Sequence, residues 1–396
     1  MSEALVDRAL RRVLIQKIEL GLLDEGWQEL PPDVEALRFD DEASQAVALR
    51  LARQSVVLLR NQDGLLPLAA DQRVALVGPV ADDAMAMLGC YTFPLHVGVH
   101  HPEYGTGVEI PSLREELQRR CPQLTHVPGT DITGEDTSGI AAAVQAAADA
   151  DVCVLAVGDR AGMFGRGTSG EGCDAVDLEL PGVQAELVRA VLATGTPVVL
   201  VVLSGRPYAL GDAVDRASAV VQAFFPGQLG GQAVAEIVTG EVNPSGRLPV
   251  SVPRHAGGLP GTYLTPILGR KSKVSSVDPT PAFPFGHGLS YTTFEWSDAA
   301  VSDAPGGDTG EPTTWPVDGE VTVGVTVRNT GARAGTEVVQ LYLHDPVAQT
   351  TRPVVRLIGY ARVPVEPGGA AAGQLRGPRR RHLVHRRARP ARGRAR

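Results

Sequence analysis

The sequence predicts an α/β protein: a three-layer α/β sandwich with a mostly parallel sheet, followed by an antiparallel β-sandwich. Between about residues 53 and 240, short apolar segments alternate with segments of helical periodicity. Strands that are apolar on both faces and joined by helices are typical of a parallel sheet covered on two sides. After Pro253 the helical periodicity stops, and residues 320–364 alternate apolar and polar side chains. That alternation indicates antiparallel strands with one buried face.

The expected elements follow in chain order. Residues 4–20 have the spacing of an amphipathic helix, and Asp41 is the expected N-cap of a second helix, whose apolar stripe includes Val47 and Leu51. The apolar segments predict strands, and the periodic segments predict helices. The strands are Ser55–Leu59, Val74–Val77, Val152–Val157, Val198–Leu203 and Ala219–Phe225, and the helices are 140–149, 182–193 and 229–239, the last closed by Gly240.

The changes of pattern give the expected domain boundaries. Residues 1–35 hold one helix and a linker, residues 36–260 form the α/β domain, residues 261–300 are a second linker, and residues 301–366 are an incomplete β-sandwich. Residues 367–396 fit neither domain, because residues 371–396 contain ten Arg and no acidic residue. We interpret this Arg-rich tail as translated out of frame; the alternative is a disordered basic tail.

Composition excludes several classes of function. The chain has 396 residues and a net charge of −8, and removing the ten arginines of the tail leaves −18 on the rest. Residues with this much negative charge repel the phosphate backbones of nucleic acids, which argues against a nucleic-acid partner. No apolar run approaches the roughly 20 residues that span a bilayer, and the first twenty residues lack the core of a signal peptide. We therefore expect no membrane partner, and we expect the protein to be cytoplasmic.

The cysteines and histidines suggest no metal centre. Four cysteines lie far apart, with no C-x-x-C pair, so neither a zinc site nor a disulfide framework is expected. His96, His100 and His101 fall in an expected loop without cysteine neighbours, and loop histidines of this kind are usually surface residues. We predict no cofactor.

The segment that carries chemistry is the glycine-rich loop from Gly158 to Asp174, which follows an apolar strand. Ligands of open α/β sheets bind where such loops leave the carboxyl ends of the strands. Gly165-Arg-Gly-Thr-Ser-Gly170 formally matches the dinucleotide motif G-x-G-x-x-G. In that motif the glycines open a helix that faces the pyrophosphate. Here the next helix is expected only near Pro181, so nucleotide binding is disfavoured.

Glu171 is the candidate catalytic residue of this loop. It lies between Gly170 and Gly172, which would let the carboxyl group swing and let the backbone approach a ligand closely. Glutamate is suited to protonating a glycosidic oxygen. From composition alone, however, an acidic residue in a glycine-rich loop is usually solvated surface.

Several segments, in the right order, resemble family 3 glycoside hydrolases over about residues 1–365. The acid/base loop of that family is similar to Ser169-Gly-Glu-Gly-Cys-Asp174 with Leu178-x-Leu-Pro-Gly-x-Gln184. Further matches are Ser55–Asn61 with Gly64–Leu68, Arg73–Gly78, Gly240–Pro249, Pro284–Tyr291, and, for a fibronectin type III-like domain, Glu337–Tyr342 with Leu357–Tyr360. One such motif could mislead, but their joint occurrence by chance is negligible.

The resemblance implies a retaining β-glycosidase in which Glu171 is the general acid/base. Phe164 and Arg166 would lie near the leaving-group sugar of a β-linked oligosaccharide or glycoside. Asp174-Ala175 departs from the family's usual Asp-Arg, so Asp174, like Asp159 and Asp177, is interpreted as a carboxylate that bonds nearby N–H groups of the loop. The matches look closest to bacterial β-xylosidases and β-glucosidases, and both sugars stay open.

The resemblance also implies what residues 1–396 lack. The family's nucleophilic Asp lies on an N-terminal (β/α)₈ barrel, a fold of roughly 250 residues, and residues 4–20 resemble only its last helix. We therefore expect a C-terminal portion that is inactive when isolated. A different hypothesis is a non-catalytic carbohydrate-binding or partner module that complements a barrel from a separate chain.

Overall fold

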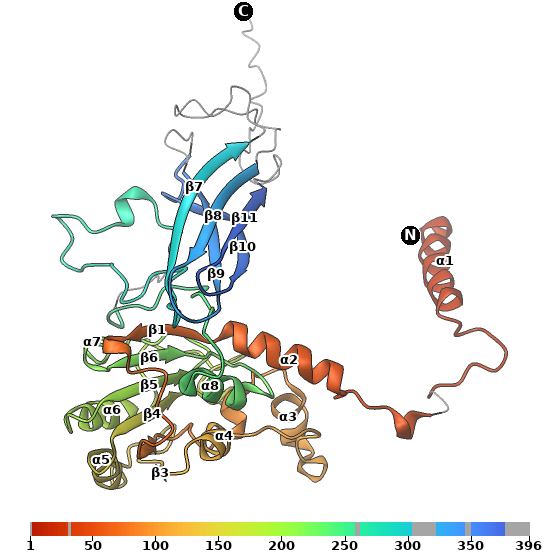
Figure 1. The fold of residues 1–396 in the computed structure, drawn as a ribbon. Coiled ribbons are helices and arrows are strands. Elements are labelled where there is room, and N and C mark those ends of the chain that lie inside the picture. Colours follow the sequence, from red (N-terminus) through yellow and green to blue (C-terminus); the bar gives the residue numbers. More distant parts are fainter. Residues whose placement is uncertain (1, 31–32, 258–261, 303–321, 345–349, 377–396) are drawn as a thin grey trace, which may run out of the picture. The chain divides into compact units, whose positions relative to one another are not determined.

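The computed structural model describes residues 2–30, 33–257, 262–302, 322–344 and 350–376 (Figure 1). The chain forms two compact units, Met1–Gln45 and Ala46–Arg396. The sequence predicts the first domain boundary after residue 35, whereas the first compact unit ends at Gln45.

The first unit contains the expected amphipathic helix. Helix α1 spans Glu3–Glu19, and its apolar side chains are all exposed. A short 3₁₀ turn, η1, follows at Val34–Ala36. Helix α2, Glu42–Ser55, crosses into the second unit. Its N-cap is confirmed, because the Ser44 N–H donates to Asp41 Oδ1 at 2.7 Å. Hydrogen bonds from the side chain and then from the backbone of Ser44 lower the pKa of the Asp41 carboxyl. The expected apolar stripe is not buried, however, since Val47 and Leu51 are exposed.

A six-stranded sheet organises the α/β part of the second unit. The strand order is β1-β6-β5-β4-β2-β3, and every pairing is parallel except that of β1 with β6. The mostly parallel sheet is thus confirmed. The strands are β1 Val57–Asn61, β2 Val74–Val77, β3 Leu124–Val127, β4 Val152–Gly158, β5 Val198–Leu203 and β6 Ala219–Gln222. All residues of β2, β4, β5 and β6 are buried, as strands covered on both faces should be.

Helices cover both faces of this sheet (Figure 1). Helices α4, Leu113–Arg120, and α8, Gly230–Thr239, contribute to one hydrophobic core. Helices α5, Ile140–Ala148, α6, Gln184–Leu192, and α7, Ala213–Arg216, contribute to the core on the other face. Gly240 closes α8 in the left-handed conformation, as expected. The shorter helical turns are α3 Phe93–His96, η2 Gln62–Gly64, η3 Ala84–Met87, η4 Gly98–His100, η5 Pro102–Tyr104 and η6 Ile267–Gly269.

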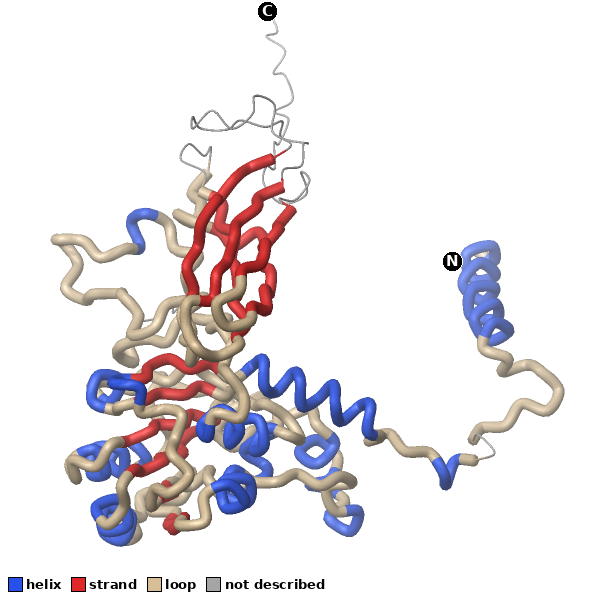
Figure 2. Tube along the Cα trace, viewed as in Figure 1, coloured by secondary structure: helices blue, strands red, loops and turns tan. Residues whose placement is uncertain are grey.

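The region from 294 to 376 is an antiparallel β-structure whose described residues include no helix (Figure 2). One sheet has the order β11-β8-β7 and the other pairs β10 with β9. A small core of Val327, Val339, Val363, Val365 and Leu375 holds the region together. The strands are β7 Phe294–Ser302, β8 Thr322–Asn329, β9 Gly335–Leu343, β10 Arg356–Val365 and β11 Ala370–Arg376.

Two expected boundaries differ from this structure. Strand β7 begins in the stretch expected to be a linker, and β11 lies in the stretch interpreted as an out-of-frame tail. Strand β11 pairs with β8 along its whole length, and Leu375 is buried in the core. Residues 370–376 therefore complete the sheet and belong to the fold. The rest of the predicted tail, 377–396, lies outside the described residues.

Candidate active site

The glycine-rich loop begins at the carboxyl end of β4 and runs from Asp159 to Val183, where α6 follows. Strand β4 pairs in parallel with both β2 and β5, so the loop leaves the sheet near its centre. The helix starts at Gln184, well beyond Gly170, and the G-x-G-x-x-G glycines therefore do not open a helix. The arrangement that a dinucleotide requires is absent from this loop.

Within the loop, two short segments run side by side. The Thr168 N–H donates to Arg160 O at 2.9 Å, the Gly162 N–H to Ser169 O at 2.9 Å, and the Phe164 N–H to Glu171 O at 2.8 Å. Gly170 is required here, because its φ is 120° and a Cβ at this position would lie 2.1 Å from Gly162 O. Gly170 therefore allows the two segments to pack closely, and a swinging Glu171 stays a prediction.

Hydrogen bonds join the loop to the segment that follows β5. The Arg206 guanidinium donates to Thr168 O and Cys173 O. The buried Asp159 carboxylate accepts from the Gly205 N–H at 3.0 Å and from the Tyr208 hydroxyl at 2.5 Å. Burial and this carboxylate raise the pKa of Tyr208. Gln184 bonds both the N–H and the carbonyl of Gly158, at 2.8 and 2.9 Å. The loop is thus held through its own carbonyl groups, through the Asp159 carboxylate and, where it leaves β4, through Gln184.

The carboxylate of Glu171 is exposed to solvent and accepts a hydrogen bond from the Tyr91 hydroxyl. This bond to the carboxylate is the main cause that raises the pKa of Tyr91. The Tyr91 ring, 66% exposed, also meets His96 edge to face with ring centroids 5.9 Å apart. The sequence alone predicts no role for Tyr91, which lies 80 residues from Glu171 along the chain.

The structure places Phe164 and Arg166 beside a cavity of about 410 Å³, which His96 and His100 also line. Phe164 has a left-handed backbone, with φ 55°, and its side chain is 71% exposed. Arg166 Nη1 lies 3.4 Å from His100 Nε2. The loop thus presents an aromatic ring and a guanidinium close to the segment that carries Glu171.

The other carboxylates predicted to structure the loop, those of Asp159, Asp174 and Asp177, differ in their hydrogen bonds. Asp159 bonds the Gly205 N–H and Asp177 Oδ1 accepts from the Glu179 N–H at 3.0 Å, which confirms their interpretation as structural groups. Asp174 forms no such bond with the residues that the structure describes, so for it the interpretation is wrong.

No group of three or more His, Cys, Asp or Glu side chains that could hold a metal ion occurs in the described part of the chain. All four cysteines are buried and free. Among the described residues, the structure contains no helix with the length and apolar composition that crossing a membrane requires.

Comparison with known families gives two matches along the chain. Residues 56–291 match the glycosyl hydrolase family 3 C-terminal domain, and residues 337–386 match the fibronectin type III-like domain. The second match extends past β11 into the Arg-rich segment.

Curated relatives align along almost the whole chain. The chain is 34% identical to a β-xylosidase of Formosa agariphila over 92% of its own length and 48% of the relative's. It is 33% identical to a periplasmic β-glucosidase of Salmonella typhimurium, over 93% of the chain and 50% of the relative. The chain spans about half the length of the curated relatives it matches.

Solved structures show the same correspondence in three dimensions. A β-glucosidase involved in saponin metabolism from intestinal bacteria aligns with a TM-score of 0.84 and 31% identity, over 96% of this chain and 54% of that one. The β-glucosidase of Listeria innocua, solved with isofagomine, aligns with a TM-score of 0.81 and 28% identity, over 95% of this chain and 50% of that one. Because the domain match alone covers more than half of the sequence, the chain belongs to glycosyl hydrolase family 3 and contains that family's C-terminal domain followed by a fibronectin type III-like domain.

Proposed function

We propose that Glu171 is the general acid/base of a retaining β-glycosidase that acts on β-xylosides or β-glucosides. The observation that carries the proposal is the exposed carboxylate, bonded to Tyr91, on a loop fixed at the carboxyl end of β4. The names of the relatives support the substrate class, since they are β-xylosidases and β-glucosidases.

Glu171 would first donate its proton to the glycosidic oxygen of the leaving group. It would then take a proton from the water that hydrolyses the glycosyl–enzyme intermediate. This mechanism needs a nucleophilic carboxylate about 5–5.5 Å from the acid/base. We propose that this nucleophile is an Asp on a (β/α)₈ barrel outside residues 1–396, supplied by a further segment or a separate chain.

Phe164 and Arg166 are proposed to contact the leaving-group sugar. The exposed ring can pack against the apolar face of a pyranose, and the guanidinium can donate to its hydroxyl groups. The Phe164 N–H donates to the Glu171 carbonyl oxygen, so the two residues are neighbours in space. A ligand that packs on the Phe164 ring would therefore lie close to the Glu171 carboxylate.

The test compares the chain alone with the chain combined with the remaining half of the Formosa β-xylosidase. Without a nucleophile the chain alone should release no nitrophenol from nitrophenyl β-xyloside or β-glucoside, and the combination should release it. In the combination, Glu171→Gln should reduce turnover about 10²–10⁴-fold. Asp174→Asn, on the same loop, is the matched control and should have little effect.

A comparison of two leaving groups tests the acid role of Glu171 specifically. Dinitrophenolate departs without protonation, so Glu171→Gln should slow glycosyl transfer from a dinitrophenyl glycoside less than from an alkyl glycoside. An equal loss for both leaving groups would contradict the acid role. Turnover by the chain alone that depends on Glu171 would contradict the proposal that the nucleophile lies elsewhere.

A non-catalytic carbohydrate-binding or partner module is the alternative function. The observation that favours it is that the chain spans about half the length of its relatives. It predicts that Glu171→Gln leaves the turnover of the combined enzyme unchanged. The cytoplasmic location stays a prediction, and the Salmonella relative is named as periplasmic.

A further inference from the structure

The segment of residues 89–96 brings a tyrosine hydroxyl to the carboxylate of Glu171. Tyr91 donates this hydrogen bond to Oε2, while Oε1 forms no hydrogen bond or ion pair with the residues that the structure describes. The two carboxylate oxygens of Glu171 therefore differ. One is held by a neighbouring side chain, and the other is left to give or accept a proton.

Buried residues fix the backbone that carries Tyr91. Cys90 and Leu95, on either side of it, are 9% and 8% exposed and belong to one hydrophobic core of the sheet. The Thr92 N–H and the Thr92 hydroxyl both donate to Gly89 O, at 3.1 and 2.8 Å, which closes a turn around Tyr91. The Tyr91 ring is exposed, but the segment that presents it is anchored.

The same segment packs directly against the loop of Glu171. A Cβ at Gly170 would lie 2.8 Å from Cys90 Cβ, so Cys90 lies against the backbone immediately before Glu171. Two consecutive residues of one segment, Cys90 and Tyr91, thus contact two consecutive residues of the other. The edge-to-face contact with His96 also restricts how the Tyr91 ring can turn. These contacts determine where the hydroxyl meets the carboxylate.

The hydroxyl suits both steps of the proposed reaction. A hydrogen bond to an ionised acceptor is about twice as strong as one between neutral groups, so the bond strengthens as Glu171 gives its proton to the leaving group. A contact that is stronger after proton transfer than before it lowers the barrier to that transfer. In the second step the same bond keeps the carboxylate in one orientation while Oε1 takes the proton from water.

We infer that Tyr91 is a positioning residue for Glu171: its hydroxyl holds Oε2 and leaves Oε1 as the oxygen that exchanges the proton. The part that Tyr91 plays in the reaction rests on the proposed acid/base role of Glu171; the positioning itself does not. Because Tyr91 acts through Glu171, its contribution to turnover should depend on the carboxylate being present.

The first experiment measures the side-chain conformation of Glu171 in the ¹³C,¹⁵N-labelled chain. Three-bond couplings across χ1 and χ2 should report one rotamer in the parent and averaging over several in Tyr91→Phe, because an exposed glutamate without a partner samples its staggered rotamers. Averaged couplings in the parent, or the same single rotamer in Tyr91→Phe, would overturn the inference.

Tyr104→Phe is the matched control for this measurement. Tyr91 and Tyr104 are both 66% exposed, but the Tyr104 hydroxyl forms no hydrogen bond with the described residues. The control substitution should therefore leave the Glu171 couplings as they are in the parent. Both substitutions keep the aromatic ring, so the comparison isolates the hydroxyl that Glu171 accepts from.

The second experiment measures turnover by the chain combined with the remaining half of the Formosa β-xylosidase. For an alkyl glycoside, Tyr91→Phe should lower kcat about 10-fold, the loss of one hydrogen bond to a charged group, and leave KM unchanged. A dinitrophenyl glycoside needs no protonation, so its kcat/KM should not change. When Tyr91→Phe is added to Glu171→Gln, no further loss should follow.

An equal loss with both leaving groups would show that the hydroxyl acts on sugar binding and would overturn the inference, as would a further loss in Glu171→Gln. The inference and the proposed function fail in different ways. If Glu171→Gln does not slow hydrolysis, the acid/base role fails, and the couplings still decide whether Tyr91 holds the carboxylate. If Glu171→Gln slows hydrolysis and Tyr91→Phe does not, only the role of Tyr91 fails.

Discussion

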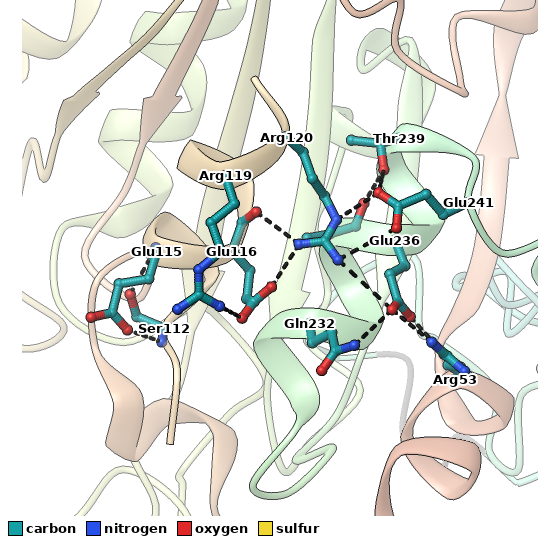
Figure 3. A network of polar contacts seen from close by, with 11 residues as sticks. Arg53, Ser112, Glu115, Glu116, Arg119, Arg120, Gln232, Glu236, Thr239 and Glu241 are labelled. Carbon is teal, nitrogen blue, oxygen red and sulfur yellow. Dashed lines mark hydrogen bonds and ion pairs between the residues drawn. The ribbon is translucent and has the colours of Figure 1, made fainter. Parts of the chain in front are cut away.

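Two glutamates of this protein occupy opposite environments. Glu236, on α8, is 3% exposed and accepts from Arg53 through two bonds of 2.6 Å and from Gln232 at 2.8 Å (Figure 3). Glu171 is exposed and has one side-chain partner, Tyr91. A buried carboxylate needs full pairing because it has lost its water. The comparison teaches that the Glu171 carboxylate is accessible to a ligand, while the Glu236 carboxylate is committed to the fold.

Glu236 belongs to a larger network that joins α2, α4 and α8 (Figure 3). Arg120 is its centre: it pairs with Glu116 at 2.6 Å, with Glu241 at 2.7 Å and with Glu236 at 3.7 Å. Arg119 also pairs with Glu116. Three carboxylates thus face three guanidinium groups, those of Arg53, Arg119 and Arg120. Balanced charge permits such burial between packed helices.

The largest difference between the two glutamates should appear in stability. Glu236→Ala leaves Arg53 without its carboxylate in a half-buried position, and breaking a buried pair in this way costs about 3–5 kcal/mol. Glu171→Ala removes an exposed side chain and should change the free energy of unfolding by less than about 0.5 kcal/mol. Urea unfolding of both variants measures the difference. Equal losses would show that the loop carboxylate also supports the fold.

The same pair should respond differently to acid. Burial raises the pKa of Glu236, but the bonds from Arg53 and Gln232 outweigh it and leave the pKa below the usual value of 4.5. The pairing therefore stabilises the fold fully above pH 4.5, and this stability is lost as the pH falls through the lowered pKa. The free energy of unfolding, measured by urea at several pH values, should fall more steeply in the parent than in Glu236→Gln. Parallel curves would contradict this.

A local effect should follow when the loop loses the guanidinium group that binds its backbone. Arg206→Met removes the donors to Thr168 O and Cys173 O, and each carbonyl left without a partner costs about 1–3 kcal/mol. Hydrogen exchange should accelerate at the Gly162 and Phe164 amides and stay slow in β4. Arg189→Met, on an exposed face of α6, is the control. Acceleration throughout the sheet would show that Arg206 supports the whole domain.

The smallest expected effect concerns Tyr91. Its pKa is raised because its hydroxyl donates to the Glu171 carboxylate, so Glu171→Gln should lower it toward the ordinary value of about 10. Alkaline titration followed by ultraviolet absorbance measures the phenolate, and Tyr91→Phe identifies which transition belongs to this ring. An unchanged titration in Glu171→Gln would show that the two side chains do not pair in solution.

How well the sequence predicted the fold depended on burial. Strands β2 and β5 match the predicted residues throughout, because every position in them is buried and apolar. Strand β3 was missed because Leu124-Thr-His-Val127 at the sheet edge is partly exposed and mixed in polarity. Helix α4 was missed because Leu113 and Leu117 are its only apolar residues, although the capping box of Ser112 and Glu115 signals its start.

The candidate site was predictable only where it lies within one segment. Glu171, Phe164 and Arg166 belong to a single glycine-rich loop after a recognisable strand. Tyr91 and Arg206 come from segments 80 and 33 residues away in sequence from Glu171 and Cys173. Their contacts depend on how the strands are ordered in the sheet, and no local pattern encodes that order.

The contact of Gly170 with the Gly162 carbonyl limits how this loop can diversify. Any side chain at 170 would force the two segments apart and move the neighbouring Glu171 with them. Arg166 is exposed and meets no such restriction, whereas the left-handed backbone of Phe164, with φ 55°, limits which residues fit at that position. A library aimed at the proposed leaving-group site should therefore randomise position 166, restrict position 164 to residues that tolerate a left-handed backbone, and hold 170 constant.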